Sequence, residues 1–345
     1  MRLFDYPPGI PGGSIGGIAT MKLPRRHFLR LAAGASALPA ISRMTWAQVY
    51  PSRPVRIVVG APAGGGIDIT ARLIGQWLSE RLGQQFVIEN RPGGGGNIAV
   101  EAVVRAPADG HTLFLATPAN AINATLYERL SFDFIRDIAP VGGLMRVPLV
   151  VVINPSLAIK TVRELIAYAK AHPGKVNMGL GGAGGVDHVA GALFRIETGA
   201  DLTFVPYRGL APALTDLMGG QIQVLFSSIA ASIQYIKAGK LQALAVTSAV
   251  RADALPDLPT VGEFVPGVEA TQWYGIVGPK GTPAAIVDRL NQAINAGLAD
   301  PGLKARLAEL GGMVLPGSPA DFAKLLANET DKWGKVIRTA HIKPV

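Results

Sequence analysis

The chain has 345 residues, of which 49% are hydrophobic and 17% are charged, so it can bury the cores of two domains. Its formal net charge is +9, but residues 1–48 hold six basic groups and one acid, which leaves +4 for the rest. No Lys/Arg run follows that segment, which argues against nucleic-acid binding. The absence of cysteine excludes disulfides, thiolate metal sites and cysteine nucleophiles.

Residues 1–48 are expected to be an export leader and not part of a folded domain. The stretch PRRHFLRLAAGASALPAISRMTWAQ joins the pair Arg25 and Arg26 to a short Ala/Gly/Leu run. It resembles a twin-arginine export signal; a general secretory signal is the alternative, and Met21 is an alternative start. The apolar run is too short to span a bilayer. We therefore expect export to the periplasm.

The first predicted unit is a strand, a glycine turn and a helix. The strand RIVV leads into GAPAGGGIDIT at 60–70, and the helical pattern runs from Asp68 to Leu82. The turn lacks the Lys and hydroxyl residue of a P-loop and the third glycine of a dinucleotide fingerprint. It therefore predicts no nucleotide site. Its backbone N–H groups and the positive end of the helix can instead bind another anion.

Strands and helices alternate through the rest of the chain. The later predicted strands read FVIE, TLFLA, LVVVIN, VNMGL, LTFVPY, IQVLF, LQALAVTS and WYGIVGP. The last helix is expected to begin at Ser318-Pro319, with Asp321 at its third position. This alternation predicts an α/β fold with mostly parallel sheets, in which ligands bind beyond the carboxyl ends of the strands.

A second glycine loop repeats the first. GGGIDITA at 64–71 aligns without gaps to AGGVDHVA at 183–190, and this places an acid, Asp68 or Asp187, at the expected N-cap of each helix. Two such loops can close on one ligand from opposite sides. Ordinary tight turns, in which glycine supplies a positive φ, are the alternative. Each acid either caps its helix or accepts a hydrogen bond from a ligand amine or hydroxyl.

From about Tyr50 to its end, the chain resembles the Bug family, the periplasmic solute receptors of tripartite tricarboxylate transporters. The segments that carry the resemblance include, in order, RPVRIVVGAPAGGGIDITARL, VIENRPGGGGNIAVEAV, GLGGAGGVDHVAGALF, VPYRGLAPALTDLMGG and WYGIVGPKGTP. The resemblance implies a two-lobed periplasmic-binding-protein fold of type II, each lobe a mostly parallel sheet flanked by helices. The chain would cross the hinge twice, with residues 49–152 plus 271–345 in lobe one and 153–270 in lobe two.

The resemblance also implies a site and a function. Bug receptors hold a small carboxylate between the two glycine loops; the equivalent positions here are Ala63, Gly65, Gly66, Asp68, Thr117, Gly184, Gly185, Val186, Asp187, Tyr207 and Ser227. The chain departs from the family at Gly185, where Ser is usual, at Ala61, where Phe is frequent, and at Ser227, which is often Asp. The implied ligand is a di- or tricarboxylate, an amino acid or an aromatic acid. A monomeric receptor without cofactor or metal would deliver it to the transporter's permease.

Two other functions stand as alternatives. A liganded receptor of this kind can contact a membrane sensor kinase instead of a permease. An enzyme acting on small carboxylates is the second, because His188 follows Asp187, yet neighbouring helix residues do not face each other. The histidines show no metal-ligand spacing such as HExxH, and no serine after the leader has the context of a nucleophile elbow. The sequence therefore predicts no catalytic residue.

Overall fold

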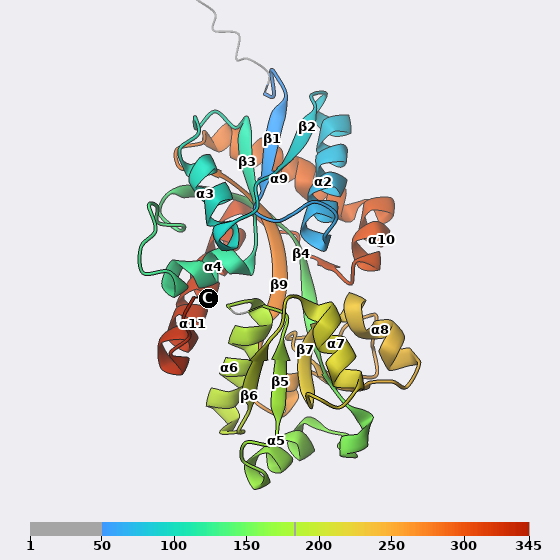
Figure 1. The fold of residues 1–345 in the computed structure, drawn as a ribbon. Coiled ribbons are helices and arrows are strands. Elements are labelled where there is room, and N and C mark those ends of the chain that lie inside the picture. Colours follow the sequence, from blue (N-terminus) through green and yellow to red (C-terminus); the bar gives the residue numbers. More distant parts are fainter. Residues whose placement is uncertain (1–49, 183, 345) are drawn as a thin grey trace, which may run out of the picture. The chain divides into compact units, whose positions relative to one another are not determined.

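The computed structural model describes residues 50–182 and 184–344, so the predicted leader at 1–48 lies outside the described residues. Helices and strands alternate along most of this part of the chain (Figure 1). The strands are β1 Val55–Val59, β2 Phe86–Asn90, β3 Thr112–Ala116, β4 Ile138–Ile153, β5 Asn177–Leu180, β6 Thr203–Pro206, β7 Val224–Ser228, β8 Gln242–Val246, β9 Thr271–Pro279 and β10 Met313–Val314. The α-helices are α2 Gly66–Leu82, α3 Asn97–Val104, α4 Pro118–Leu126, α5 Val162–Ala171, α6 Val186–Thr198, α7 Leu210–Met218, α8 Ile229–Lys237, α9 Ala284–Ala299, α10 Pro301–Glu309 and α11 Pro319–Ala340. Short 3₁₀ turns lie at Gly94–Gly96, Pro155–Leu157 and Val261–Glu263.

Strand β4 joins two groups of strands, because its 16 residues extend over roughly 50 Å. Its first part pairs with β9 along 138–148, and its last part pairs with β7 and β8 along 149–153. The strand order is β2-β1-β3-β9-β4-β7-β5-β6, with β10 and β8 also pairing with β4. We call β2, β1, β3, β9, β10 and the first part of β4 the β1 sheet. The last part of β4 with β7, β5, β6 and β8 is the β5 sheet (Figure 1).

Parallel pairs form the outer part of each sheet. Strand β1 pairs in parallel with β2 and β3, and β5 pairs in parallel with β6 and β7. The pairs of β4 and β9 are antiparallel, because β4 runs from the β1 sheet to the β5 sheet and β9 runs back. The chain therefore passes between the two sheets twice. The lobe boundaries after residues 152 and 270 stay a prediction.

Apolar side chains form three clusters in the described chain. One surrounds β1, α2, α9 and α10 and includes Leu78 and Leu290. A second lies among β7, α7, α8 and β8 and includes Leu217. The third runs from Phe114 in β3 through Trp333 in α11 to Phe194 in α6, so it spans both sheets on one side. The first two clusters stay separate, which leaves space between the sheets on the other side.

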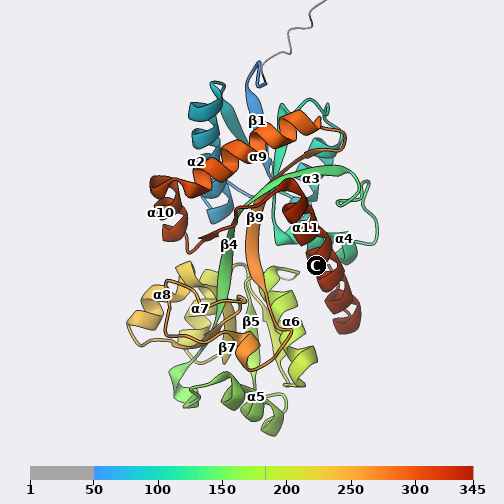
Figure 2. The same ribbon diagram turned by 180° about the vertical axis from the view of Figure 1, so that it is seen from behind.

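Helix α11 covers the side on which the third cluster lies (Figure 2). It begins as predicted: the Ser318 hydroxyl accepts from the Asp321 N–H, and the Asp321 carboxylate accepts from the Ser318 N–H. It packs against α4, β4 and α6. Within residues 50–182 and 184–344, no helix combines the length and hydrophobicity that a bilayer-spanning segment needs.

Candidate functional site

The first glycine loop ends at the start of α2, whose N-cap is Gly65. Gly64 has a φ of +88°, a conformation that glycine adopts without strain, and its N–H donates to Oδ2 of Asp68 over 2.9 Å. The same carboxylate accepts from Nε of Arg72 over 2.9 Å and from Nδ2 of Asn90 over 3.0 Å. The Arg72 guanidinium lowers the pKa of Asp68 to about 2, so this buried acid is charged, and it is bonded to the loop, to α2 and to the end of β2.

The second loop has the same backbone form but a different partner. Gly184 has a φ of +76°, and its N–H donates to Nδ1 of His188 over 3.0 Å. Burial, together with the charge of Arg195, lowers the pKa of His188, which keeps the ring neutral and leaves Nδ1 as an acceptor. The ring also packs edge-on against Phe204, with 5.1 Å between centroids. His188 therefore fixes the shape of this loop.

The gapless alignment of the two loops is wrong by one residue. The left-handed glycines are Gly64 and Gly184, and the N-caps are Gly65 and Gly185. This equivalence pairs Asp68 with His188, and each accepts from the glycine four residues before it. The sequence alignment paired Asp68 with Asp187 because both are aspartates, whereas the backbone conformation shows that Asp68 and His188 are the equivalent positions.

Neither acid occupies the predicted N-cap. Both helices have glycine there and no side-chain cap, and Asp68 and Asp187 are the third and second residues of their helices. The cap prediction failed because each acid lies inside its helix; at Gly185 a Cβ would crowd the Asp187 carboxylate, whereas around Gly65 there is open space. The first N–H groups of α2 thus have no N-cap side chain to satisfy them, whereas in α6 the Asp187 carboxylate accepts from the N–H groups of Asp187 and His188.

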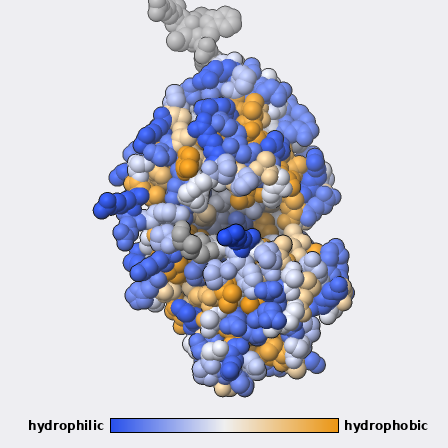
Figure 3. Space-filling model, viewed as in Figure 1, coloured by the Kyte–Doolittle hydropathy of each residue, from blue (hydrophilic) through white to orange (hydrophobic). Residues whose placement is uncertain are grey.

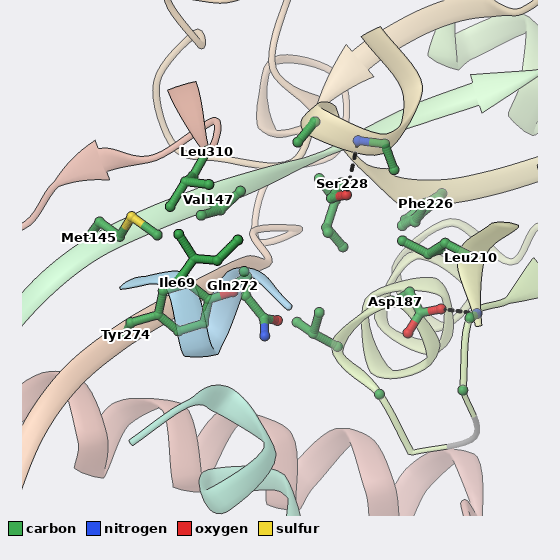
Figure 4. A pocket seen from close by; sticks show the side chains of 18 of the residues that line it. Ile69, Met145, Val147, Asp187, Leu210, Phe226, Ser228, Gln272, Tyr274 and Leu310 are labelled. Carbon is green, nitrogen blue, oxygen red and sulfur yellow. Dashed lines mark hydrogen bonds between the residues drawn. The ribbon is translucent and has the colours of Figure 1, made fainter. Parts of the chain in front are cut away.

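A cavity of about 680 Å³ opens between the two sheets, where these helices begin. Figure 3 shows the hollow on the face drawn in Figure 1, and Figure 4 shows its walls. The β1-sheet side supplies α2, the first part of β4, β9 and the end of α10, and the β5-sheet side supplies the second glycine loop, α6, α7, β7 and α8. The described lining residues are Gly66, Ile69, Met145, Val147, Leu149, Gly181, Gly182, Gly185, Val186, Asp187, Leu210, Phe226, Ser228, Ala230, Ala231, Gln272, Tyr274, Glu309 and Leu310.

Neutral hydrogen-bonding groups gather where α2 meets β9. A Cβ on Gly66 would lie 3.9 Å from the Tyr274 hydroxyl, so this hydroxyl is next to the first residue of α2. Burial raises the pKa of Tyr274 to about 12, and the hydroxyl stays a donor at neutral pH. The Gln272 side chain comes from the same strand two residues earlier and lines the same wall (Figure 4). This part of the cavity can bind an anion through uncharged donors.

The opposite part of the cavity holds a buried carboxylic acid. Oδ2 of Asp187 accepts from the Gly181 N–H, as the dashed line in Figure 4 marks. Burial raises the pKa of Asp187 to about 6, against the lowering effect of the Gly181 amide. A Cβ on Gly185 would lie 2.6 Å from Oδ1 of Asp187 and 3.1 Å from the Gly182 carbonyl oxygen. This crowding explains why the chain has glycine at 185: a serine does not fit beside the Asp187 carboxylate.

The structure brings part of the predicted set together. Gly66, Gly185, Val186 and Asp187 line the cavity, while Ala63, Gly65 and Gly184 belong to the adjoining loops. The remaining predicted residues are not among the described lining residues, and their binding role stays a prediction; they are Asp68, Thr117, Tyr207 and Ser227.

Each of these four has partners elsewhere. Thr117 lines a separate cavity of about 70 Å³ that Ala61 also borders, so the small side chain at 61 widens that space and not the main cavity. The Tyr207 hydroxyl donates to Asp216 over 2.7 Å. Ser227 is buried and accepts from the Ser232 hydroxyl over 2.6 Å. Alternation along β7 points Phe226 and Ser228 into the cavity and Ser227 away from it.

Sequence reasoning missed the walls supplied by the two long strands. Met145, Val147 and Leu149 alternate along β4, and Gln272 and Tyr274 alternate along β9. Residues two positions apart share one face of a strand, and this spacing in the sequence could have indicated the wall residues. The described residues contain no group of three His, Asp or Glu side chains arranged to bind a metal ion.

Comparison with known proteins identifies the family and the fold of the chain. The family model of the tripartite tricarboxylate transporter family receptor matches residues 70–342. The chain belongs to this family. BugT from Bordetella pertussis is 34% identical to the receptor, covering 89% of this chain and 95% of BugT. The resemblance to the Bug family is therefore confirmed, and the protein is a solute-binding receptor of the periplasmic type.

Solved structures confirm the two-lobed α/β fold of the receptor. An R. palustris protein solved with adipate has a TM-score of 0.74 and 38% identity, covering 86% of this chain and all of that one. MatC from Rhodopseudomonas palustris, with bound malate, has a TM-score of 0.70 and 31% identity, covering 84% of this chain and all of that one. The β1 sheet and the β5 sheet are the centres of the two lobes, and the cavity lies between them.

Proposed function

We propose that the receptor captures a small carboxylate in the cavity between its lobes and delivers it to the permease of a tripartite tricarboxylate transporter. The observation that carries this proposal is the meeting of two helix starts without side-chain caps, α2 at Gly66 and α6 at Val186, in one cavity. Each helix start favours an anion by about 0.3–1 kcal/mol, and by up to ~2 kcal/mol when partly buried. Charge-assisted N–H bonds add about 1.5–3 kcal/mol each.

The ligands of related proteins support the same class of solute. The R. palustris structures contain adipate and malate, which are both small carboxylates. Two or three amide bonds together with closure of the lobes give roughly micromolar affinity, near −8 kcal/mol. Di- and tricarboxylates, amino acids and aromatic acids are the candidate solutes within this class.

The geometry favours binding over catalysis. Nδ1 of His188 is engaged by the Gly184 amide, and the Asp187 carboxylate is engaged by the Gly181 amide, so the two side chains form no acid–base pair. We assign no catalytic residue, cofactor or metal to the receptor. A twin-arginine-like signal within residues 1–48 would export it to the periplasm, where it would act as a monomer. A membrane sensor kinase is the alternative recipient of the liganded receptor.

A matched pair of glycine variants tests the carboxylate site. Gly66→Ala keeps the fold, because its new methyl group meets the nearest atom, the Tyr274 hydroxyl, at an ordinary 3.9 Å. Alanine in a helix is favoured over glycine by roughly 0.5–1 kcal/mol. The methyl group nevertheless separates a carboxylate from the first N–H groups of α2. Gly219→Ala is the control: it ends α7 away from the cavity, and its methyl group would lie 3.5 Å from the nearest atom.

Thermal-shift screening against mono-, di- and tricarboxylates, amino acids and aromatic acids identifies the solute class. A ligand at 100 times its Kd raises the free energy of unfolding by about 2.7 kcal/mol. We expect Gly66→Ala to weaken the best acid at least tenfold in calorimetry, while Gly219→Ala leaves its Kd unchanged. Unaltered affinity in Gly66→Ala would remove the first helix start from the site. Failure of every acid to shift a folded, ligand-free sample would overturn the proposed function.

A further inference from the structure

The walls of the cavity are largely apolar, and this limits the ligands that fit it. Large aliphatic or aromatic side chains come from both lobes: Ile69, Met145 and Leu310 on the β1-sheet side, and Leu210 and Phe226 on the β5-sheet side. Burying apolar ligand surface against such walls stabilises a complex by roughly 25 cal/mol per Å². A compact tricarboxylate has almost no apolar surface to contribute. The cavity therefore favours a ligand with an apolar body.

The charged groups of the cavity are both acidic. Asp187 is buried and Glu309 is exposed at the rim, and none of the described lining residues is Lys, Arg or His. A carboxylate deep in the cavity relies on neutral donors, which suffice for one anion at the start of α2. A second carboxylate on the same ligand would lose its water without gaining a cation, and it would approach Asp187. The cavity thus selects against a second negative charge at its far end.

Donors and acceptors lie on opposite walls. Gly66, the Tyr274 hydroxyl and Gln272 belong to α2 and β9, whereas Asp187 belongs to α6 (Figure 4). The carboxylate of a ligand is best placed on the α2–β9 wall, since that wall supplies N–H and O–H groups. The other end of the ligand then points toward Asp187.

Asp187 is available to a ligand, unlike Asp68. No side chain among the described residues donates to the Asp187 carboxylate, which accepts only from the backbone amides of Gly181, Asp187 and His188. Glycine at 185 leaves Oδ1 without a neighbouring side chain on that side. Asp68, in contrast, already bonds to Gly64, Arg72 and Asn90 and does not line the cavity. Asp187 is therefore the one of the two acids that can accept from a bound molecule.

We infer that the solute is a monocarboxylate with an apolar body whose far end is a hydroxyl or ammonium group, and that Asp187 accepts a hydrogen bond from that group. This inference rests on the proposed carboxylate-binding function and adds the chemistry of the other end. Asp187 acts as the specificity-determining residue: it attracts a donor and repels a second carboxylate. The inference predicts that this receptor prefers such a monocarboxylate to a dicarboxylate of the same chain length.

Two matched series of acids test it, because their members differ only at the far end. The aliphatic series is hexanoate, 6-hydroxyhexanoate, 6-aminohexanoate and adipate. The aromatic series is 4-methylbenzoate, 4-(hydroxymethyl)benzoate, 4-(aminomethyl)benzoate and terephthalate. Calorimetry at neutral pH gives the Kd of each acid for the wild-type protein, Asp187→Asn and the control Glu197→Gln. Circular dichroism establishes that each variant is folded.

In at least one series, we expect the hydroxy or amino acid to bind at least tenfold more tightly than the diacid. Asp187→Asn should weaken the amino acid about tenfold, tighten the diacid and leave the methyl-terminated acid within twofold. Glu197→Gln, which removes an exposed acid of the same helix outside the cavity, should preserve the wild-type order. These shifts together would support Asp187 as the group that reads the far end.

A diacid that binds most tightly, with an order unchanged in Asp187→Asn, would overturn the inference while leaving the proposed function in place. The exposed Arg208 provides a further check, since it precedes the lining residue Leu210 by two positions. A preference for the diacid that Arg208→Ala abolishes would assign the second carboxylate to the rim and also overturn the inference. Absence of binding by all eight acids to folded protein would overturn this inference, and the wider screen of acids would then decide the proposed function.

Discussion

Asp187 and Asp68 occupy similar loops but respond to pH in opposite ways. Burial raises the pKa of Asp187 to about 6 from its ordinary 3.8, whereas the Arg72 guanidinium lowers the pKa of Asp68 to about 2. Between pH 3.8 and 6 the folded chain therefore binds more protons at Asp187 than the unfolded chain does. The contribution of Asp187 to the free energy of unfolding is present at the low end of this range and is lost as the pH rises through 6.

Replacing Asp187 by Asn should remove this loss, because Asn keeps an oxygen for the Gly181 amide without the charge. At pH 8 we expect Asp187→Asn to be more stable than the wild type by an amount on the order of 3 kcal/mol, and at pH 4 the two should be nearly equal. Urea unfolding at both pH values measures the difference. Asp68→Asn is the control with the opposite sign, since it should lose stability at pH 8. If the free energy of unfolding of Asp187→Asn differs from that of the wild type by the same amount at both pH values, the raised pKa of Asp187 is contradicted.

Helix α11 is held to strand β9 by a buried carboxylate. Oε2 of Glu329 accepts from the indole N–H of Trp273 over 3.1 Å and from that of Trp333 over 2.8 Å. Oε1 of Glu329 pairs with Lys332, whose ammonium also lies 4.2 Å from the centre of the Trp333 ring. This cluster fixes the helix that packs along both lobes to one of the strands that connects them.

We expect Glu329→Ala to lower the free energy of unfolding by about 3–5 kcal/mol, because it leaves two buried indole N–H groups and the Lys332 ammonium without their partner. Glu329→Gln retains an oxygen acceptor and should cost less. Asp331→Ala, which breaks the exposed pair with Lys335 on the same helix, should cost at most about 0.5 kcal/mol. Urea unfolding followed by tryptophan fluorescence gives all three values. Equal losses in Glu329→Ala and Asp331→Ala would show that the cluster is not a structural anchor.

Alternation of strands and helices was enough to predict most elements, but not the length of β4. The expected strand was LVVVIN, whereas β4 begins at Ile138. Pro140, Gly142, Gly143 and Pro148 disfavour a strand by local propensity. The register shifts between Pro140 and Gly142 and between Gly143 and Met145 accommodate the first three as irregularities in the pairing with β9. Tertiary pairing thus overrides the local signal.

The glycine loops were predictable as helix starts that can bind an anion, yet the rest of the site was not. The first and second loops supply Gly66 and Asp187 to the cavity, as the sequence suggested. Tyr274 and Met145 reach the same cavity from strands that are far apart in the chain, and only the pairing of those strands brings them together. Alternation in the sequence indicates which residues share one face of a strand, but it does not show that these faces of β4 and β9 line the same cavity.

For the molecule as a whole, the size of the cavity predicts movement of the two lobes. A volume of about 680 Å³ is typical of a site for a drug-sized ligand, and a small acid fills only part of it. We expect the lobes to close on a bound acid, since an acid that contacts both lobes binds the closed state more tightly and shifts the population toward it.

Spin labels at two exposed alanines, Ala299 at the end of α9 and Ala211 in the first turn of α7, measure this closure. The chain has no cysteine, so Ala299→Cys and Ala211→Cys together give one labelled pair without background. Double electron–electron resonance should show a shorter mean distance after a binding acid is added. The same pair with Gly66→Ala should keep the unliganded distance at that acid concentration. An unchanged distance under saturating acid would mean that the receptor binds without closing.

Strands β4 and β9 supply pocket walls at the place where they connect the lobes. Redesign of the receptor as a biosensor for a new solute therefore changes two properties together: the shape of the pocket and the open–closed equilibrium of the unliganded protein. A bulkier side chain at Val147 would act as a wedge between the lobes as well as a new wall for the solute. Its effect on affinity would combine the lost space with a shifted balance between open and closed receptor. Surface positions outside the glycine loops and these strands, such as Ala299 at the end of α9, are the places at which a reporter dye leaves that balance unchanged.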